Sequence, residues 1–437
     1  MLSIINPIRS LLAGVALLLI GNGLLNTLLT LRGAAEGFSS SLIGLLMSGY
    51  FLGFLLGTWL AVPLILRIGH IRTFAFCAAL CACAALLHVL IINPWVWFIL
   101  RLVYGMALIT LYLVIENWLT AQTSSPQRGQ VFATYMVVNL VALALGQQLL
   151  NLASPQSFTL FALTAILICC ALMPITLTRQ AQPSLPEKPK TNLRMLFEVA
   201  PLAVAAAGFS GLVLGAFWGM APVYASLNGF DSDGIAMLMS VTIIGGALLQ
   251  WPIGRFSDKH DRRKVLLTIT LIATLLALAM SLLSAGPLLL GVLFFWGGLV
   301  FCLYPLAVVQ MVDQMHPDEI LAGSTGLLLV NGFGSALGPV IAGSLMEQFG
   351  PEALALFFAV SLSALAAFIV YRQRHVSDLR NEPHGHFAPM LRTSHTVLEL
   401  LPDAPPSEEE HEQETGINSN DASNAQTTSE RTDPSAQ

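Results

Sequence analysis

Two ionisable side chains, Arg101 and Glu116, stand inside one long apolar stretch of the chain, residues 95–119. A charge in such surroundings is costly, so an ionisable residue there is a functional candidate by default. Glu116 is the acid placed deepest in any apolar stretch, and its carboxyl group could take up and release a proton. In a straight helix the two groups would lie about 22 Å apart along the axis, so each needs another partner.

Both residues also have a structural interpretation. Arg101 could extend to the polar end of its helix and leave the apolar region. Glu116 stands near the other end of the stretch, where it could pair with a base: Arg67, Arg72 or Arg128. The sequence leaves these alternatives open beside a role in proton coupling.

Polar and aromatic residues recur at helical spacing in several apolar stretches. Residues four positions apart share one face of a helix, as Asn22 and Asn26 do. Such faces predict a cavity in which amides hydrogen-bond an organic solute and aromatic rings stack on it. The alternative for each residue is packing or an interhelical hydrogen bond. The candidates are Asn22, Asn26, Tyr104, Tyr112, Asn139, Gln147, Trp218, Trp296, Tyr304 and Asn331.

The elements that must position these residues are membrane-spanning helices. The chain is 55% hydrophobic and 10% charged, whereas soluble domains are roughly 25% charged. A helix needs about 20 apolar residues to cross the hydrocarbon core of a membrane. Twelve stretches satisfy this, and they are residues 10–31, 41–65, 73–92, 95–119, 130–150, 157–177, 199–226, 234–253, 265–284, 287–312, 321–345 and 352–371.

Basic residues predict the orientation, because positively charged loops stay on the cytoplasmic side. Numbering the loops alternately puts Arg67, Arg72, residues 178–194 and the cluster 255–264 on one side, and Arg32 on the other. Both chain ends are therefore expected in the cytoplasm, which an even number of spans requires. The formal charge of −5 comes from an acidic C-terminal segment, and the rest of the chain is basic.

The chain matches itself at an offset of 192 residues. Residues 37–60 and 229–252 are identical at ten of 24 positions, with Ser48 over Ser240. The two halves, of six spans each, are therefore one duplicated unit. Internal repeats of this kind are typical of transporters in which one half rocks against the other around a midplane site.

We thus predict an all-α integral membrane protein with twelve transmembrane helices in two six-helix repeats around a central cavity. The expected parts are an N-terminal bundle (1–177), a cytoplasmic linker (178–198), a C-terminal bundle (199–375) and a disordered acidic cytoplasmic tail (376–437). The linker is Pro-rich and polar, and the tail has the polar composition of disordered segments.

The most specific motif lies in the cytoplasmic turn at residues 252–264. Gly254 is followed four residues later by Asp258 and then by bases that include Arg262 and Arg263. Gly254 permits a close approach of helices, and the charged groups can pair across an interface, so the turn could latch one conformation. The alternative is that the bases only hold the turn at the anionic leaflet.

This motif, placed after the second span of its half, resembles the signature of the major facilitator superfamily. Residues 101–107, where Gly105 follows Arg101 by four positions, are similar to the superfamily's motif in the fourth helix. The resemblance implies alternating access and a link between Arg101 and proton coupling. Residues 114–119, 129–132 and 303–306 are similar to the YcaD-like bacterial branch of the superfamily.

The chain departs from the superfamily pattern at two places. Val62 and Leu66 replace the Gly and the Asp of the signature in the first half, which weakens a latch there. Gly146 and Gln147 stand where exporters of the superfamily commonly carry Gly-Pro, which argues against proton antiport.

The predicted function is secondary active transport of a small organic solute across the bacterial inner (plasma) membrane, coupled to protons. The coupling candidates are Glu116 and Arg101, and the latch comprises Gly254, Asp258, Arg262 and Arg263. The alternatives are an uncoupled facilitator or lipid flippase, and a membrane sensor or scaffold.

Neither an enzyme nor a cofactor-binding protein is expected. The six Cys residues all lie in apolar stretches and have no metal-ligand spacing. The expected partners are the solute, protons and the lipid bilayer, with no nucleic acid and no metal, and the expected assembly is a monomer.

Overall fold

The computed structural model describes residues 2–123, 128–176, 193–316 and 319–375. Their helices are α1 (Leu2–Ala35), α2 (Ser40–Ile68), α3 (His70–Leu90), α4 (Pro94–Ala121), α5 (Arg128–Gln148) with the 3₁₀ turn η2 (Leu149–Leu152), α6 (Phe158–Thr176), α7 (Leu193–Val199), α8 (Pro201–Leu227), α9 (Ser232–Asp258), α10 (Arg262–Leu282), α11 (Pro287–Val300), α12 (Leu303–Val312), α13 (Ile320–Phe349) and α14 (Ala353–His375).

These helices confirm the predicted spans. Within the described ranges, 12 segments are long and apolar enough to cross a membrane. The predicted tail, 376–437, lies outside the described residues, as does most of the predicted linker, 178–198. The last residues of that linker form α7, a short helix that the sequence did not predict.

The second span of each half begins in the same way. Gly37 and Gly229, which are equivalent at the offset of 192, have φ angles of 79° and 81° that favour glycine. Two residues later, Ser39 accepts a hydrogen bond from the backbone of Leu42, and Asp231 accepts one from Gly234. These caps start α2 and α9, because each supplies an acceptor to an otherwise unpaired helix N–H.

Glycines allow neighbouring helices to touch through their backbones. A Cβ atom at Gly53 of α2 would run into the carbonyl oxygen of Leu102 of α4, and one at Gly245 of α9 would run into that of Phe294 of α11. Both partners in the second crossing follow their counterparts by 192 residues. A second equivalent pair is formed by Gly105 against Tyr50 and Gly297 against Thr242. The repeat is therefore preserved in its backbone contacts as well as in its sequence.

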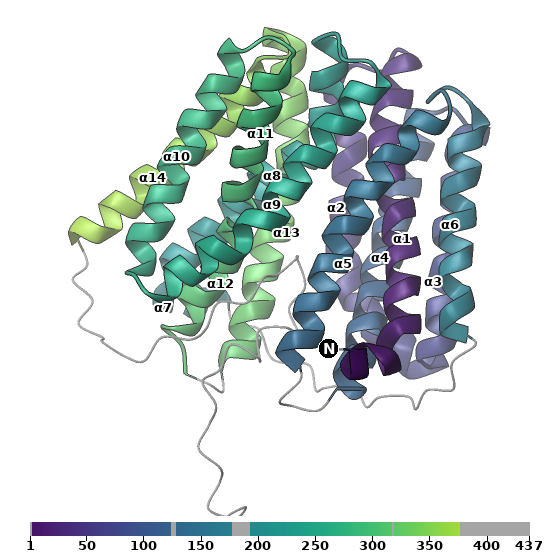
Figure 1. Ribbon diagram of the computed structural model, residues 1–437, viewed down its shortest axis with the longest axis horizontal. Helices are drawn as coiled ribbons and strands as arrows, with labels where there is room; N and C mark the ends of the chain where they lie inside the picture. The colour runs from purple at the N-terminus through teal and green to yellow at the C-terminus, as the bar shows by residue number, and fades with distance from the viewer. Residues whose placement is uncertain (1, 124–127, 177–192, 317–318, 376–437) are drawn as a thin grey trace, which may run out of the picture. The chain divides into compact units, whose positions relative to one another are not determined.

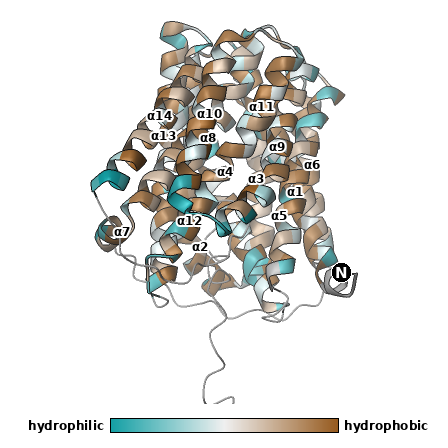
Figure 2. Ribbon diagram, turned by 60° about the vertical axis from the view of Figure 1, so that its left-hand side comes forward, coloured by the Kyte–Doolittle hydropathy of each residue, from teal (hydrophilic) through white to brown (hydrophobic). Residues whose placement is uncertain are grey.

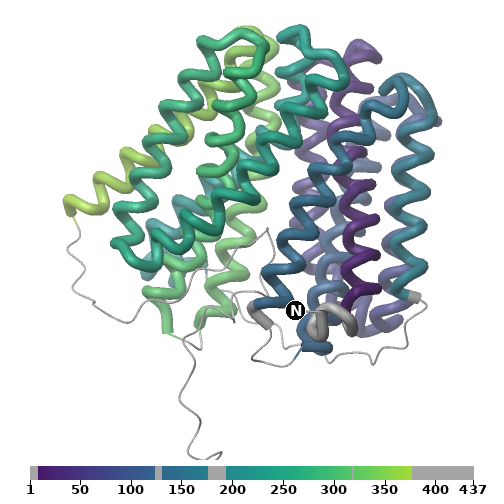
Figure 3. The backbone as a smooth tube through the Cα atoms, viewed as in Figure 1, coloured from purple at the N-terminus to yellow at the C-terminus, as the bar shows by residue number. Residues whose placement is uncertain are grey.

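The tenth span differs from its counterpart in the first half. It is broken into α11 and α12 around residues 301–302, whereas α4 is continuous (Figure 3). Pro305 follows the break, and its equivalent in the first half is Leu113. Proline lacks an N–H and its ring clashes with the carbonyl four residues before it, which explains the interruption.

Helices α1 to α6 pack with one another, and α8 to α14 do the same (Figure 1). Between the halves, α2 packs against α13 and α5 against α9. We call the end at which α1 and α8 finish the distal end, and the opposite end, which carries α7, the proximal end (Figure 1). Hydrophobic residues cover most of the helix lengths, and hydrophilic residues gather toward the ends (Figure 2).

The glycine crossings predict a clear difference between two substitutions. Gly105→Val should lower the free energy of unfolding by about 1 to 3 kcal/mol, because the added side chain forces α4 away from α2. Gly291→Ala on α11 should be neutral or stabilising, because a Cβ there meets nothing within 4 Å. Thermal unfolding of the purified protein in detergent measures both, and equal midpoints for the two variants would contradict the crossing.

Candidate functional site

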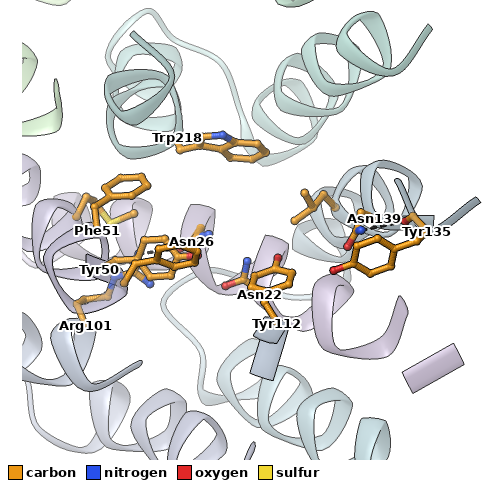
Figure 4. A pocket seen from close by; sticks show the side chains of 12 residues that line it. Asn22, Asn26, Tyr50, Phe51, Arg101, Tyr112, Tyr135, Asn139 and Trp218 are labelled. Carbon is orange, nitrogen blue, oxygen red and sulfur yellow. Dashed lines mark hydrogen bonds between the residues drawn. The ribbon is translucent and has the colours of Figure 1, made fainter. Parts of the chain in front are cut away.

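A cavity lies between the two halves, lined by residues of α1, α2, α4, α5 and α8. Its volume is about 710 Å³, which includes the solvent space at its open side. Trp218 of α8 lies on one side, opposite Asn22 and Asn26 of α1 (Figure 4). Of the residues predicted from the sequence, those that line the cavity are Asn22, Asn26, Arg101, Tyr112, Asn139 and Trp218.

Asn26 and Trp218 are equivalent in the repeat and contribute to the cavity from opposite halves. The ionisable groups follow no such symmetry. The equivalents of Arg101 and Glu116 in the second half are the apolar residues Leu293 and Val308. The first half therefore supplies the charged side chains, Arg101 and Glu116, and the second half contributes the aromatic ring of Trp218.

The Arg101 side chain lies inside the bundle, with 1% of the residue exposed. Its Nη2 atom donates a hydrogen bond of 2.7 Å to Oδ1 of Asn26. Its Cζ atom lies 4.6 Å from the ring centroid of Tyr50 and 5.9 Å from that of Tyr104, which are cation–π distances. The structure thus does not support the alternative in which Arg101 extends to the polar end of its helix.

Glu116 is equally buried, with 1% exposed, but does not line the cavity. Its carboxyl group interacts electrostatically with the side chain of Tyr135, which does line it. Asn139, one turn further along α5, donates from Nδ2 to the Tyr135 carbonyl oxygen over 2.9 Å. Tyr135 therefore connects the buried carboxyl group to the cavity.

Two predicted cavity residues instead join helices. Gln147 accepts a hydrogen bond of 2.5 Å from Thr27 and donates one of 3.1 Å to the carbonyl of Gly23, which ties α5 to α1. Asn331 donates from Nδ2 to the carbonyl of Ala207 over 2.9 Å and ties α13 to α8. For both residues the interhelical alternative is correct, because their amides face a neighbouring backbone.

Three predicted aromatic residues are buried away from the cavity: Tyr104, Trp296 and Tyr304. Trp296 packs against Phe358, with ring centroids 4.6 Å apart. Tyr104 and Trp296 each precede a crossing glycine, so they lie where their helices meet neighbours of the same half. The prediction failed here because helical spacing groups residues by face without saying which face borders a cavity.

The sequence analysis missed several lining residues. The missed residues are Met47, Tyr50, Phe51, Phe54, Tyr135 and Leu143. The first four follow the helical spacing of one face of α2, and Tyr135 stands four residues before Asn139 on α5. Those spacings were a usable signal, but the α2 residues belong to a strongly apolar span, in which the same spacing is equally compatible with packing.

The predicted latch residues lie at the proximal end of the second half. Arg262, at the start of α10, pairs with Asp258 at the end of α9 over 3.4 Å and with Asp313 at the end of α12 over 3.1 Å. Gly254 is buried in α9, and the Arg263 backbone N–H donates to Asp261, which caps α10. Arg262 thus holds three helices of one half together, and its role as a latch between conformations stays a prediction.

The two carboxylates around Arg262 should differ in importance. Asp313 is nearer and less exposed than Asp258, with 15% against 26% of the side chain exposed. Asp313→Asn should therefore lower the free energy of unfolding more than Asp258→Asn does. The loss for Asp313→Asn should be on the order of 3 kcal/mol, because the buried Arg262 loses its nearer carboxylate. Thermal unfolding in detergent ranks the variants, and a larger loss for Asp258→Asn would contradict this assignment.

A bundle of twelve apolar spans in two repeated halves, with a cavity of aromatic and amide side chains between them, defines a membrane transporter. The chain belongs to the major facilitator superfamily, whose family model matches residues 11–324 and again residues 203–402. It is a multi-pass membrane protein and not an enzyme.

The relatives of the chain are bacterial. It is similar to the uncharacterised MFS-type transporter YcaD of Escherichia fergusonii, with 31% identity over 375 residues that cover 85% of this chain and 97% of the relative. It is also similar to YcaD of Escherichia coli K12, with 32% identity over 356 residues that cover 81% of this chain and 92% of the relative. The similarity to the YcaD-like branch is thereby confirmed.

Solved structures share the fold. The nucleoside transporter NupG matches with a TM-score of 0.67 and 16% identity, covering 84% of this chain and 99% of that one. A bacterial homologue of the human lysosomal transporter Spinster, inward-facing and occupied, matches with a TM-score of 0.65 and 16% identity, covering 85% and 97%. The E. coli fucose:proton symporter FucP has a TM-score of 0.52 and 18% identity, covering 85% and 99%.

Proposed function

We propose that this protein is a proton-coupled secondary transporter that moves a small organic solute across the bacterial inner membrane by alternating access. The observation that carries the proposal is the cavity between the halves, which both halves line. A site at such an interface becomes accessible from alternate sides when the halves rock. An uncoupled facilitator or lipid flippase, and a sensor or scaffold, are the alternatives that the experiments below distinguish.

The contacts between the halves gather toward the distal end and follow the repeat. Ser48 of α2 donates a hydrogen bond to the carbonyl of Ala336 of α13. Ser240 of α9 donates one of 3.0 Å to the carbonyl of Ala144 of α5. Both the serines and the carbonyls are separated by 192 residues, so we call these two hydrogen bonds the serine pair. The serine pair supports a closed distal end with pseudo-twofold symmetry.

Further contacts reinforce this closure. The backbone N–H of Ser41 donates to Oε2 of Glu347 over 3.0 Å, and Nε2 of Gln148 donates to Oγ of Ser240 over 2.7 Å. Gly44 and Gly343 let α2 and α13 approach until a Cβ atom on either would strike the other backbone. Tight packing at one end leaves the opposite end as the route to the cavity.

The orientation that we propose places the proximal end in the cytoplasm. The basic residues of the α2–α3 and α9–α10 turns lie there, and positively charged loops stay on the cytoplasmic side. With the distal end closed, the structure is then an inward-facing state in which the solute would exchange with the cytoplasm.

Glu116 is our proposed proton carrier. It is a buried carboxyl group that interacts electrostatically with Tyr135, and Tyr135 lines the cavity. Protonation of Glu116 would remove a buried charge and change this interaction, so solute binding and proton uptake can influence each other. Burial, a proton-carrying group and contact with the cavity wall are the features that a coupling residue needs.

The serine pair predicts matched effects in the two halves. Ser48→Val and Ser240→Val should each shift the protein toward the state with an open distal end, because each removes a hydrogen bond made only when that end is closed. Labelling of a single cysteine placed at Trp218 with a membrane-impermeant reagent, from the outside of cells, should rise several-fold.

Thr270→Val is the matched control for the serine variants. Its buried hydroxyl bonds the carbonyl of Leu266 within α10, so its removal should leave labelling unchanged. Unchanged labelling in both serine variants, with the protein folded, would contradict the proposed gate.

Glu116→Gln tests proton coupling, because glutamine keeps the shape and hydrogen bonding of the side chain but cannot titrate. Proteoliposomes are incubated with a bacterial metabolite extract, and their contents are compared by mass spectrometry with and without an imposed proton gradient. In the wild type the gradient should increase the content of at least one solute. In Glu116→Gln that increase should vanish, while exchange of the same solute continues, since exchange needs no net proton movement.

Three other outcomes would count against the proposal. Gradient-driven accumulation at the wild-type level in Glu116→Gln would reject the coupling role. Movement of a solute that ignores the gradient in the wild type would favour a facilitator. Failure of every solute to move would favour a sensor or scaffold.

A further inference from the structure

We propose that Arg101 binds an anionic group of the solute, so that the protein transports an organic anion with an aromatic or apolar body. This inference rests on the proposed transport function and narrows its substrate class. It follows from the unbalanced positive charge of Arg101 in the cavity wall and from the aromatic residues that line the rest of that wall.

The guanidinium of Arg101 is buried but incompletely satisfied. Among the described residues, the guanidinium has one hydrogen-bond partner, the neutral amide of Asn26, which accepts from Nη2. Within the described part of the chain, Nε and Nη1 are buried and have no hydrogen-bond partner. A guanidinium offers five N–H donors in a planar fork that matches a carboxylate or phosphate, so two of its nitrogens are available to such a group.

The described helices around Arg101 offer no carboxylate near enough to balance this charge. The helices that pack against α4 are α1, α2, α3 and α5, and none of their sequences contains Asp or Glu. α8, which faces the cavity from the other half, has none either. α4 itself carries Glu116, which lies about 22 Å further along the helix axis.

An isolated charge in a low-dielectric interior is expensive unless it is paired. The rings of Tyr50 and Tyr104 offset part of the cost through cation–π contacts, but they carry no net charge. Since the described helices around Arg101 supply no counter-charge, we expect it to come from the anionic group of a bound solute. A cavity that Arg101 itself lines is where such a group can enter.

The rest of the cavity wall fits an apolar or aromatic body. Aromatic rings line it from both halves, with Tyr50 and Tyr112 on one side and Trp218 on the other (Figure 4). Phe54 adds a further ring to the wall. Asn22 adds an amide that can donate to or accept from a polar substituent. A positive group among aromatic rings selects against organic cations, although the rings alone would attract them.

Matched probes of one shape and different charge test the inference by thermal unfolding of the purified full-length protein. The probes are 3-phenylpropionate, phenyl phosphate, neutral 3-phenylpropionamide and cationic 3-phenylpropylamine, with sodium chloride as the inorganic control. One or both organic anions should raise the unfolding midpoint. The amide should need roughly ten times the concentration for an equal shift, and the amine should give none. The anion that acts more strongly distinguishes a carboxylate from a phosphate.

Three variants locate the effect. Arg101→Met should abolish the shift by the anions. Asn26→Asp should abolish it too, because the new carboxylate would occupy the guanidinium in the place of the ligand, and its unfolding midpoint without ligand should be at or above that of the wild type. Arg101→Lys keeps the charge without the fork, so it should retain a preference for anions with roughly tenfold weaker binding.

The inference would be overturned by equal shifts from anion and amide, by a larger shift from the amine, by no shift from any probe, or by a chloride shift as large as that of the organic anions. An anion shift that survives in a folded Asn26→Asp protein would also overturn it. The proteoliposome assay separates this failure from failure of the proposed function. Accumulation of only neutral or cationic metabolites would leave transport in place and reject the anion site, whereas no movement of any solute would reject transport itself.

Discussion

The structure depends on the close approach of helix backbones at positions that carry no side chain. In a membrane, apolar side chains gain little by leaving lipid for protein, so van der Waals contact between well-fitted helices has to hold the bundle together. Gly53 and Gly105 provide that contact between α2 and α4, and their equivalents Gly245 and Gly297 provide it between α9 and α11. α2 and α4 line the cavity, and α2 and α9 contact the opposite half. The glycine crossings therefore determine the positions of the cavity residues.

The duplication explains why so much of the fold could be predicted from sequence. Span lengths follow from hydrophobicity, and the offset of 192 residues places each helix of the second half by analogy with the first. The exceptions have local causes. Pro305 breaks the tenth span where Leu113 leaves the fourth intact, and α7 is too short to give a recognisable periodic pattern.

The candidate site was predicted less completely, for a physical reason. An amide on an apolar helix can face a cavity or a neighbouring carbonyl, and both uses satisfy its hydrogen-bonding capacity. Asn26 and Gln147 have the same kind of side chain and similar surroundings in the sequence, yet one lines the cavity and the other ties α5 to α1. Only the rotation of each helix about its axis decides between these uses, and that rotation is set by packing partners distant in the sequence.

The two halves contribute equally to the contacts that close the distal end but unequally to the cavity wall. The serine pair takes one hydroxyl and one carbonyl from each half, so a change at either position disturbs an arrangement that depends on both. Arg101 and Glu116, the charged groups in and near the cavity wall, both belong to α4, and almost all of the lining comes from the first half. After the ancestral gene was duplicated, one copy could therefore acquire new ligand contacts while both copies conserved the contacts between the halves. Paralogues with different substrates could arise through substitutions in four helices, with those contacts left intact.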